Sequence, residues 1–70
     1  MISKETMRKI IDEEAEKASA GSGYDAEDLI EHMRNHDSVW EMTEEGVRQF
    51  YGYYFTDMVR ILLAEEEEDH

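Results

Sequence analysis

A chain of 70 residues has room for one domain, and the absence of cysteine excludes disulfide bonds and thiolate zinc sites. The net charge of −12 repels nucleic acid and anionic membrane surfaces and favours basic partners. The longest apolar run, Ile61 to Ala64, is far too short to span a bilayer, and the first residues do not form a signal peptide. We therefore expect a cytoplasmic protein that binds neither nucleic acid directly nor membranes.

The acidic residues are distributed unevenly. Residues 1–20 carry five acids and four bases, residues 21–46 carry eight acids and one base, and residues 47–70 carry six acids and two bases. The excess of negative charge therefore lies in the middle of the chain and at its end.

A first helix is predicted over residues 4–19, with Ser3 as its N-cap. Its apolar residues recur at helical spacing and form one narrow stripe, which consists of Met7, Ile10, Ile11, Ala15 and Ala18. The other side carries oppositely charged residues four apart, which is typical of a solvated helix face. The following Gly21-Ser22-Gly23 ends the helix in a flexible turn.

A shorter second helix is predicted over residues 25–36, with Asp25 as its N-cap. Residues 37–42 could form a helical turn, from which Val39, Trp40 and Met42 fill the core.

A third helix is predicted over residues 43–64 and is the strongest element, because most of its apolar residues fall within an arc of about 140°. The residues in this arc are Phe50, Ile61, Tyr54, Val47, Met58, Tyr51, Leu62 and Phe55. Val59, Leu63 and Tyr53 lie outside it. Residues 65–70 are expected to be an acidic, mobile tail, since four glutamates oppose the helix dipole. The predicted fold is thus all-α: a three-helix domain organised by its long C-terminal helix.

The apolar arc of the third helix is wider than a single neighbouring helix can cover. Either both other helices pack against it, or part of it meets a second copy in a homodimer. A small helical adaptor that binds its partner through this apolar face is therefore one open interpretation.

Metal binding and catalysis have little support in the sequence. His32 and His36 are four residues apart on the second helix and could share a metal ion, which makes them weak candidates for a metal-responsive module. No calcium-binding loop, phosphate-binding loop or nucleophile motif is present, so neither a cofactor nor an enzymatic activity is expected.

The acidic middle of the chain supports the main functional hypothesis. Carboxylates on successive helical turns lie about 5–6 Å apart, a spacing similar in scale to that of charges along a nucleic-acid strand. Such an array would occupy the basic groove of a nucleic-acid-binding protein and block it. Its candidate residues are Asp25, Glu27, Asp28, Glu31, Asp37, Glu41, Glu44 and Glu45, together with Tyr53 as an amphipathic contact on a polar helix face. The alternative is an acidic surface that only keeps the domain soluble.

In size and composition the chain resembles small acidic helical inhibitors encoded by phages and plasmids, such as anti-CRISPR and anti-restriction proteins. This resemblance implies a non-enzymatic inhibitor of nucleic-acid machinery. It involves no shared motif, so it assigns a role to no individual residue.

Overall fold

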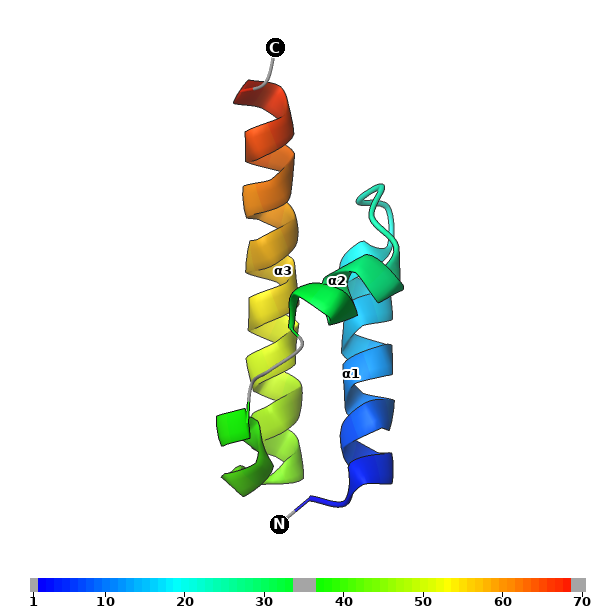
Figure 1. Cartoon of the computed structure of the whole chain (residues 1–70), viewed down its shortest axis with the longest axis vertical. Coiled ribbons are helices and arrows are strands. Elements are labelled where there is room, and N and C mark those ends of the chain that lie inside the picture. Colours follow the sequence, from blue (N-terminus) through cyan, green and yellow to red (C-terminus); the bar gives the residue numbers. More distant parts are fainter. Residues whose placement is uncertain (1, 34–36, 69–70) are drawn as a thin grey trace.

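The computed structural model describes residues 2–33 and 37–68, and all regular structure in these two segments is helical. Helix α1 spans Lys4–Ser19, α2 spans Ala26–His32, the short 3-10 helix η1 spans Asp37–Glu41, and α3 spans Glu44–Glu68 (Figure 1). This confirms the predicted three-helix domain with a long C-terminal helix. None of the helices in these two segments combines the length and the apolar character that crossing a membrane requires.

Local sequence signals set the first helix and its end. The Ser3 hydroxyl accepts a hydrogen bond from the Thr6 amide at 3.2 Å, which confirms Ser3 as the N-cap of α1. After Ala20 the backbone enters the left-handed region at Gly21 and Gly23, with φ of 74° and 91°. Glycine adopts this conformation without the steric cost that a β-carbon imposes. The turn brings α2 back against α1.

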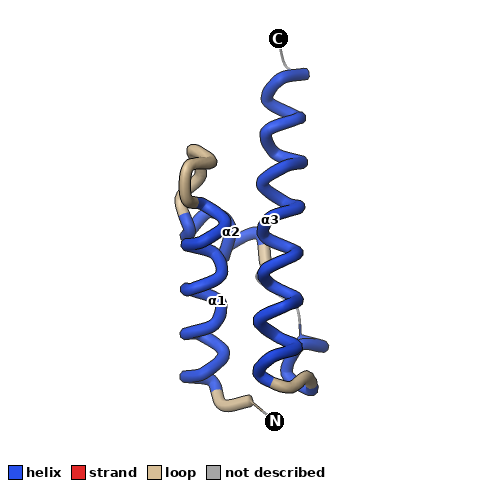
Figure 2. Tube along the Cα trace, turned by 180° about the vertical axis from the view of Figure 1, so that it is seen from behind, coloured by secondary structure: helices blue, strands red, loops and turns tan. Residues whose placement is uncertain are grey.

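Helices α1 and α3 lie side by side and run in the same direction, and α2 and η1 connect the end of α1 to the start of α3 (Figures 1 and 2). Helix α2 packs mainly on α1. Because α3 is longer than α1, its C-terminal turns project beyond the rest of the molecule (Figure 2). The result is an elongated shape with extents of 45 × 19 × 17 Å.

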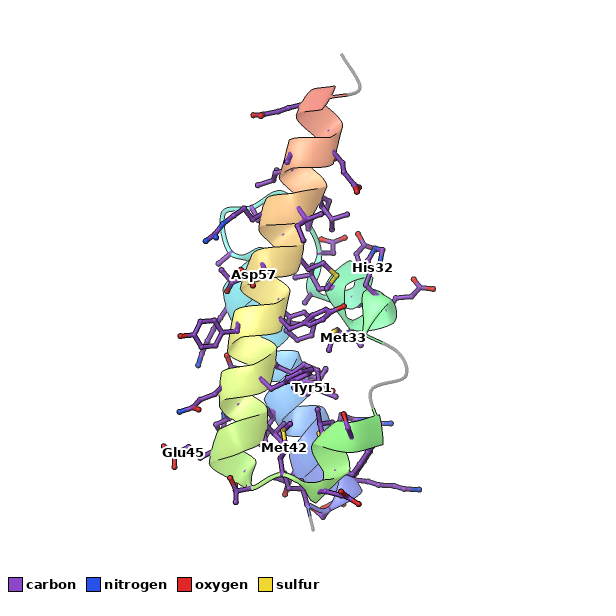
Figure 3. The ribbon with its side chains drawn as sticks, turned by 90° about the vertical axis from the view of Figure 1, so that its left-hand side faces the viewer. His32, Met33, Met42, Glu45, Tyr51 and Asp57 are labelled. Carbon is purple, nitrogen blue, oxygen red and sulfur yellow. The ribbon has the colours of Figure 1, made fainter. Side chains whose placement is uncertain are left out.

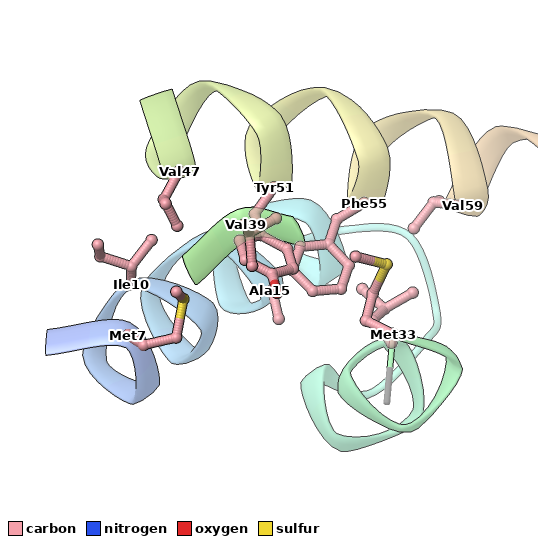
Figure 4. Packing of buried hydrophobic residues seen from close by; sticks show 10 residues of the cluster. Met7, Ile10, Ala15, Met33, Val39, Val47, Tyr51, Phe55 and Val59 are labelled. Carbon is pink, nitrogen blue, oxygen red and sulfur yellow. The ribbon is translucent and has the colours of Figure 1, made fainter. Parts of the chain in front are cut away.

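The core lies where α1, α2 and η1 meet one side of α3. Figure 4 shows Val47, Tyr51, Phe55 and Val59 along α3, facing Met7, Ile10 and Ala15 of α1 and Met33 next to α2. The four α3 residues are spaced four apart, and this row winds slowly around the helix because four residues exceed one turn. Val59 is therefore buried at 8% exposure, whereas Ile61 is 58% exposed. The prediction had these two residues the other way round.

Two predicted helix ends differ from the structure, and one expected packing contact is only partly formed. Helix α2 ends at His32 rather than near 36, with Met33 as its C-cap. Helix α3 continues to Glu68 rather than ending at 64, so residues 65–68 are helical despite the unfavourable dipole. Of the three residues expected to fill the core from residues 37–42, Val39 is buried, Trp40 is half-buried and Met42 is exposed.

Candidate functional site

Arg48 of α3 contacts three carboxylates, two on α1 and one on its own helix. Its guanidinium lies 2.7 Å from Glu13, 4.0 Å from Glu14 and 3.5 Å from Glu44. The hydrogen bond from Arg48 holds the pKa of Glu13 below its ordinary value, and the same bond raises the pKa of Arg48. On the helical wheel Arg48 falls outside the apolar arc of the third helix. The structure instead makes it the electrostatic link between the two parallel helices.

Glu14 is the one buried charged residue in the described segments, at 9% exposure. It sits opposite Gly52 of α3, where an added β-carbon would lie 3.4 Å from its Oε2 atom. Lys17 contacts Glu14 at 3.4 Å from the solvent side. Two cations of the chain are therefore used to neutralise acids at the α1–α3 interface.

The acids predicted on the second helix are all exposed. Asp25, Glu27, Asp28 and Glu31 lie on or directly before α2, and no ion pair involves them within residues 2–33 and 37–68. The ion pairs of Lys17, Arg48 and Arg60 are made with other acids. The acids of α2 are thus exposed to solvent and carry unpaired negative charge.

An open groove between α1 and α2 adds two acids that the sequence analysis did not select. Asp12 and Glu16 of α1 line it together with Tyr24, Asp25 and Glu27. The sequence pattern placed Asp12 and Glu16 on a charge-balanced helix. Only the return of α2 against α1 turns them toward the acids of the second helix.

The C-terminal acids reach the same end of the molecule. Burial raises the pKa of the Tyr24 hydroxyl, and so do Glu66, which lies within hydrogen-bonding reach of it, and the nearby charge of Glu65. Two acids of α3 therefore lie close to the turn that precedes α2. We call the exposed carboxylates gathered here the acidic surface, and they are Asp12, Glu16, Asp25, Glu27, Asp28, Glu31, Glu65 and Glu66.

The other predicted acids lie apart from this surface. Glu41, Glu44 and Glu45 are exposed at the η1–α3 junction, and Glu44 contacts Arg48. Twenty-two residues of helix separate Glu44 from Glu66, which is about 33 Å at a rise of ~1.5 Å per residue. Figure 3 shows Glu45 near one end of α3 and His32 much further along the molecule. The acids from 25 to 45 thus form two groups. The side chain of Asp37 lies outside the described part of the chain.

The remaining candidates are Tyr53 and the two histidines. Tyr53 is 76% exposed, which confirms its predicted position away from the core, while its role as a contact stays a prediction. His32 is exposed at the end of α2, and His36 lies outside the described residues. Within the described segments, no group of three or more His, Cys, Asp or Glu side chains is placed to hold a metal ion.

Comparison with known proteins found no matching family model, no matching curated protein and no matching solved structure.

Proposed function

We propose that this protein binds a basic protein through the acidic surface and thereby competes with nucleic acid for that protein. The observation that supports the proposal is the separation of paired from unpaired charge. Arg48 and Lys17 neutralise Glu13 and Glu14 at the α1–α3 interface, while the α2 acids have no ion pair among the described residues. A basic partner would relieve the repulsion between these neighbouring carboxylates.

The arrangement of the acids favours competition with nucleic acid over general solubilisation. Charge that serves only solubility can be spread over the whole surface, whereas here α1 and α2 contribute carboxylates to one groove and α3 adds two more near Tyr24. Asp28 and Glu31 are one helical turn apart on α2, a spacing of about 5–6 Å. The function is thus binding rather than catalysis, in the manner of the small acidic inhibitors that phages and plasmids encode. We expect the partner to be met inside the cell.

The experiment begins with immobilised protein and a nuclease-treated lysate of the native host. Bound proteins are eluted with a salt gradient, and each is then tested for displacement by duplex DNA. We expect affinity to fall steeply and log-linearly with salt, because several ion pairs form on binding. DNA should compete for the same partner.

Two matched double variants locate the contact. Asp28→Asn with Glu31→Gln neutralises two acids of the acidic surface, and Glu41→Gln with Glu45→Gln removes the same charge from the other group. We expect the first pair to weaken binding about tenfold or more and the second pair to have a much smaller effect. Affinity that is unchanged by moderate salt, or a partner that DNA does not displace, would show that the proposal is wrong.

A further inference from the structure

Between residues 49 and 64, the side of α3 turned away from α1 and α2 is exposed and electrically neutral. It includes Tyr53 at 76% exposure and Ile61 at 58%, with the side chains of Arg60 and Asp57 at 78% and 63%. Figure 3 shows Asp57 on the opposite side of α3 from His32 and Met33. We call this side the outer face, and it consists of Gln49, Tyr53, Thr56, Asp57, Arg60, Ile61 and Ala64. In a chain of net charge −12, a face with one acid and one base is well suited to contact another copy.

Four residues of the outer face follow the spacing of a helix-pairing seam. Tyr53, Asp57, Arg60 and Ala64 are separated by four, three and four positions and fall within an arc of about 60°. An open groove runs beside them, lined by Gln49, Gly52, Tyr53, Thr56, Asp57 and Arg60. A helix laid along this seam would contact all four side chains.

We infer that the outer face binds a second copy of this chain, with the two α3 helices antiparallel and residues 57 and 60 of opposite copies facing each other. In this register Asp57 lies opposite Arg60 of the second copy, and Tyr53 lies opposite Ala64. The large ring of Tyr53 then packs against the small Ala64. Because the dimer is two-fold symmetric, the Asp57–Arg60 contact forms twice. Within one chain the same two charges are 3.8 Å apart and largely exposed, a contact of little energetic value.

The charge pattern disfavours a parallel pairing in register. Two parallel copies in register would place Asp57 against Asp57, Arg60 against Arg60 and the acidic C-terminal turns against each other, all of which are repulsive. In the antiparallel arrangement the C-terminal turns of one copy pass the uncharged Gly52 and Gln49 region of the other. Glu66 is directed toward Tyr24 of its own chain and so away from the contact.

This contact differs from the homodimer considered from the sequence. Val47, Tyr51 and Phe55 of the predicted apolar arc are buried within the single chain, so they cannot serve a second copy. Apart from Ile61, which belongs to both, the outer face lies outside that arc. It covers one side of one helix, which is small against the roughly 1,600 Å² of a standard interface, so we expect a dimer that dissociates on dilution.

Self-association through the outer face is independent of the proposed function, and the two respond to salt in opposite directions. Each copy carries a net charge of −12, so the copies repel each other at long range. Added salt screens this repulsion beyond about 8 Å near physiological ionic strength, while the facing side chains remain in contact. Self-association should therefore strengthen with salt, whereas binding to a basic partner should weaken.

Sedimentation equilibrium over a concentration series tests the inference. Asp57→Arg and Arg60→Asp each place like charges opposite one another, and we expect each to raise the dimer dissociation constant about tenfold or more. The double exchange of both residues restores opposite charges at the unchanged net charge of −12 and should restore the dimer. The single variants change the net charge in opposite directions, so an effect of total charge alone would strengthen one and weaken the other. Circular dichroism of each variant verifies that the helices are retained.

Two cysteine variants test the orientation, because the chain has no cysteine of its own. A mixture of Tyr53→Cys and Ala64→Cys proteins should form the mixed disulfide on mild oxidation, in preference to either like pair. Eleven residues of helix separate positions 53 and 64, about 16 Å, so one register cannot favour both kinds of bond. A monomer at all concentrations, a double exchange that fails to restore the dimer, or preferential bonding between like positions would overturn the inference.

Discussion

Arg48 of α3 donates a hydrogen bond to Glu13 of α1 over 2.7 Å, and the two residues are 35 positions apart in the sequence. The same guanidinium lies 4.0 Å from the buried Glu14. A parallel pair of helices is thus joined by one cation among several acids. This matters in a chain with only seven basic residues, because a cation used here is not available to neutralise the surface.

Replacing Arg48 with methionine should lower the thermal midpoint clearly, because Glu14 then keeps only Lys17 as a neighbouring cation. Methionine retains much of the apolar stem, so the change acts mainly on charge. Arg8→Met is the matched control, since Arg8 is exposed and has no ion pair within the described segments. Differential scanning calorimetry of both variants checks the prediction. Equal midpoints would show that Arg48 does not stabilise the interface.

The contact between Glu13 and Arg48 should make stability depend on pH below about 5. The hydrogen bond from Arg48 lowers the pKa of Glu13 from its ordinary 4.5, so the unfolded chain binds a proton more readily than the folded one. The stabilisation is therefore complete above pH 4.5 and is lost as the pH falls through the lowered pKa. Thermal midpoints measured from pH 7 to pH 3 should fall less steeply for Glu13→Gln than for the unmodified protein. Parallel curves would contradict this.

Val59 and Ile61 provide a direct test of which residues form the core. Val59→Ala removes buried methyl groups and should cost about 2 kcal/mol, from ~0.8 kcal/mol per methylene plus a cavity contribution. Ile61→Ala removes exposed surface and should change the free energy of unfolding by less than about 0.5 kcal/mol. Urea denaturation at low protein concentration, where self-association is absent, measures both. The reverse order would favour the helical-wheel prediction over the structure.

Gly52→Ala should stabilise the protein. Alanine is favoured over glycine inside a helix by about 0.5–1 kcal/mol, and the new β-carbon would lie at an ordinary contact distance of 3.4 Å from Glu14. Gly52→Leu should instead destabilise, because the longer side chain would displace the Glu14 carboxylate from the interface. Opposite shifts of the thermal midpoint are the expected result. A loss of stability with alanine would mean that the helices tolerate no added atom at this point.

Much of the fold follows from local pattern. Ser3 caps α1 through a contact three residues away, and Gly21 and Gly23 break the helix because they readily adopt positive φ. The exposure of Tyr53 also follows from its position on the wheel. The extent of α3 was harder to predict, because the four glutamates oppose the dipole and the helix nevertheless includes them.

The candidate site was predictable only in part. The exposed acids of α2 are evident from the sequence, but the contribution of Asp12 and Glu16 depends on α2 returning against α1. The proximity of Glu66 to Tyr24 joins residues that are far apart along the chain. The residue pattern of a single helix predicts neither contact, because both depend on how two helices lie against each other.

The sequence by itself therefore determined the helices, their caps and the large excess of negative charge, since these depend on residues within a turn or two of each other. Only the tertiary structure decided that α1 and α3 run parallel, that Arg48 joins them, and that Val59 rather than Ile61 is buried. The physical reason is that a helical wheel shows how wide an apolar face is but not where its neighbours lie. Those positions are set by the packing of the whole core, which also decides which charges are paired and which remain exposed.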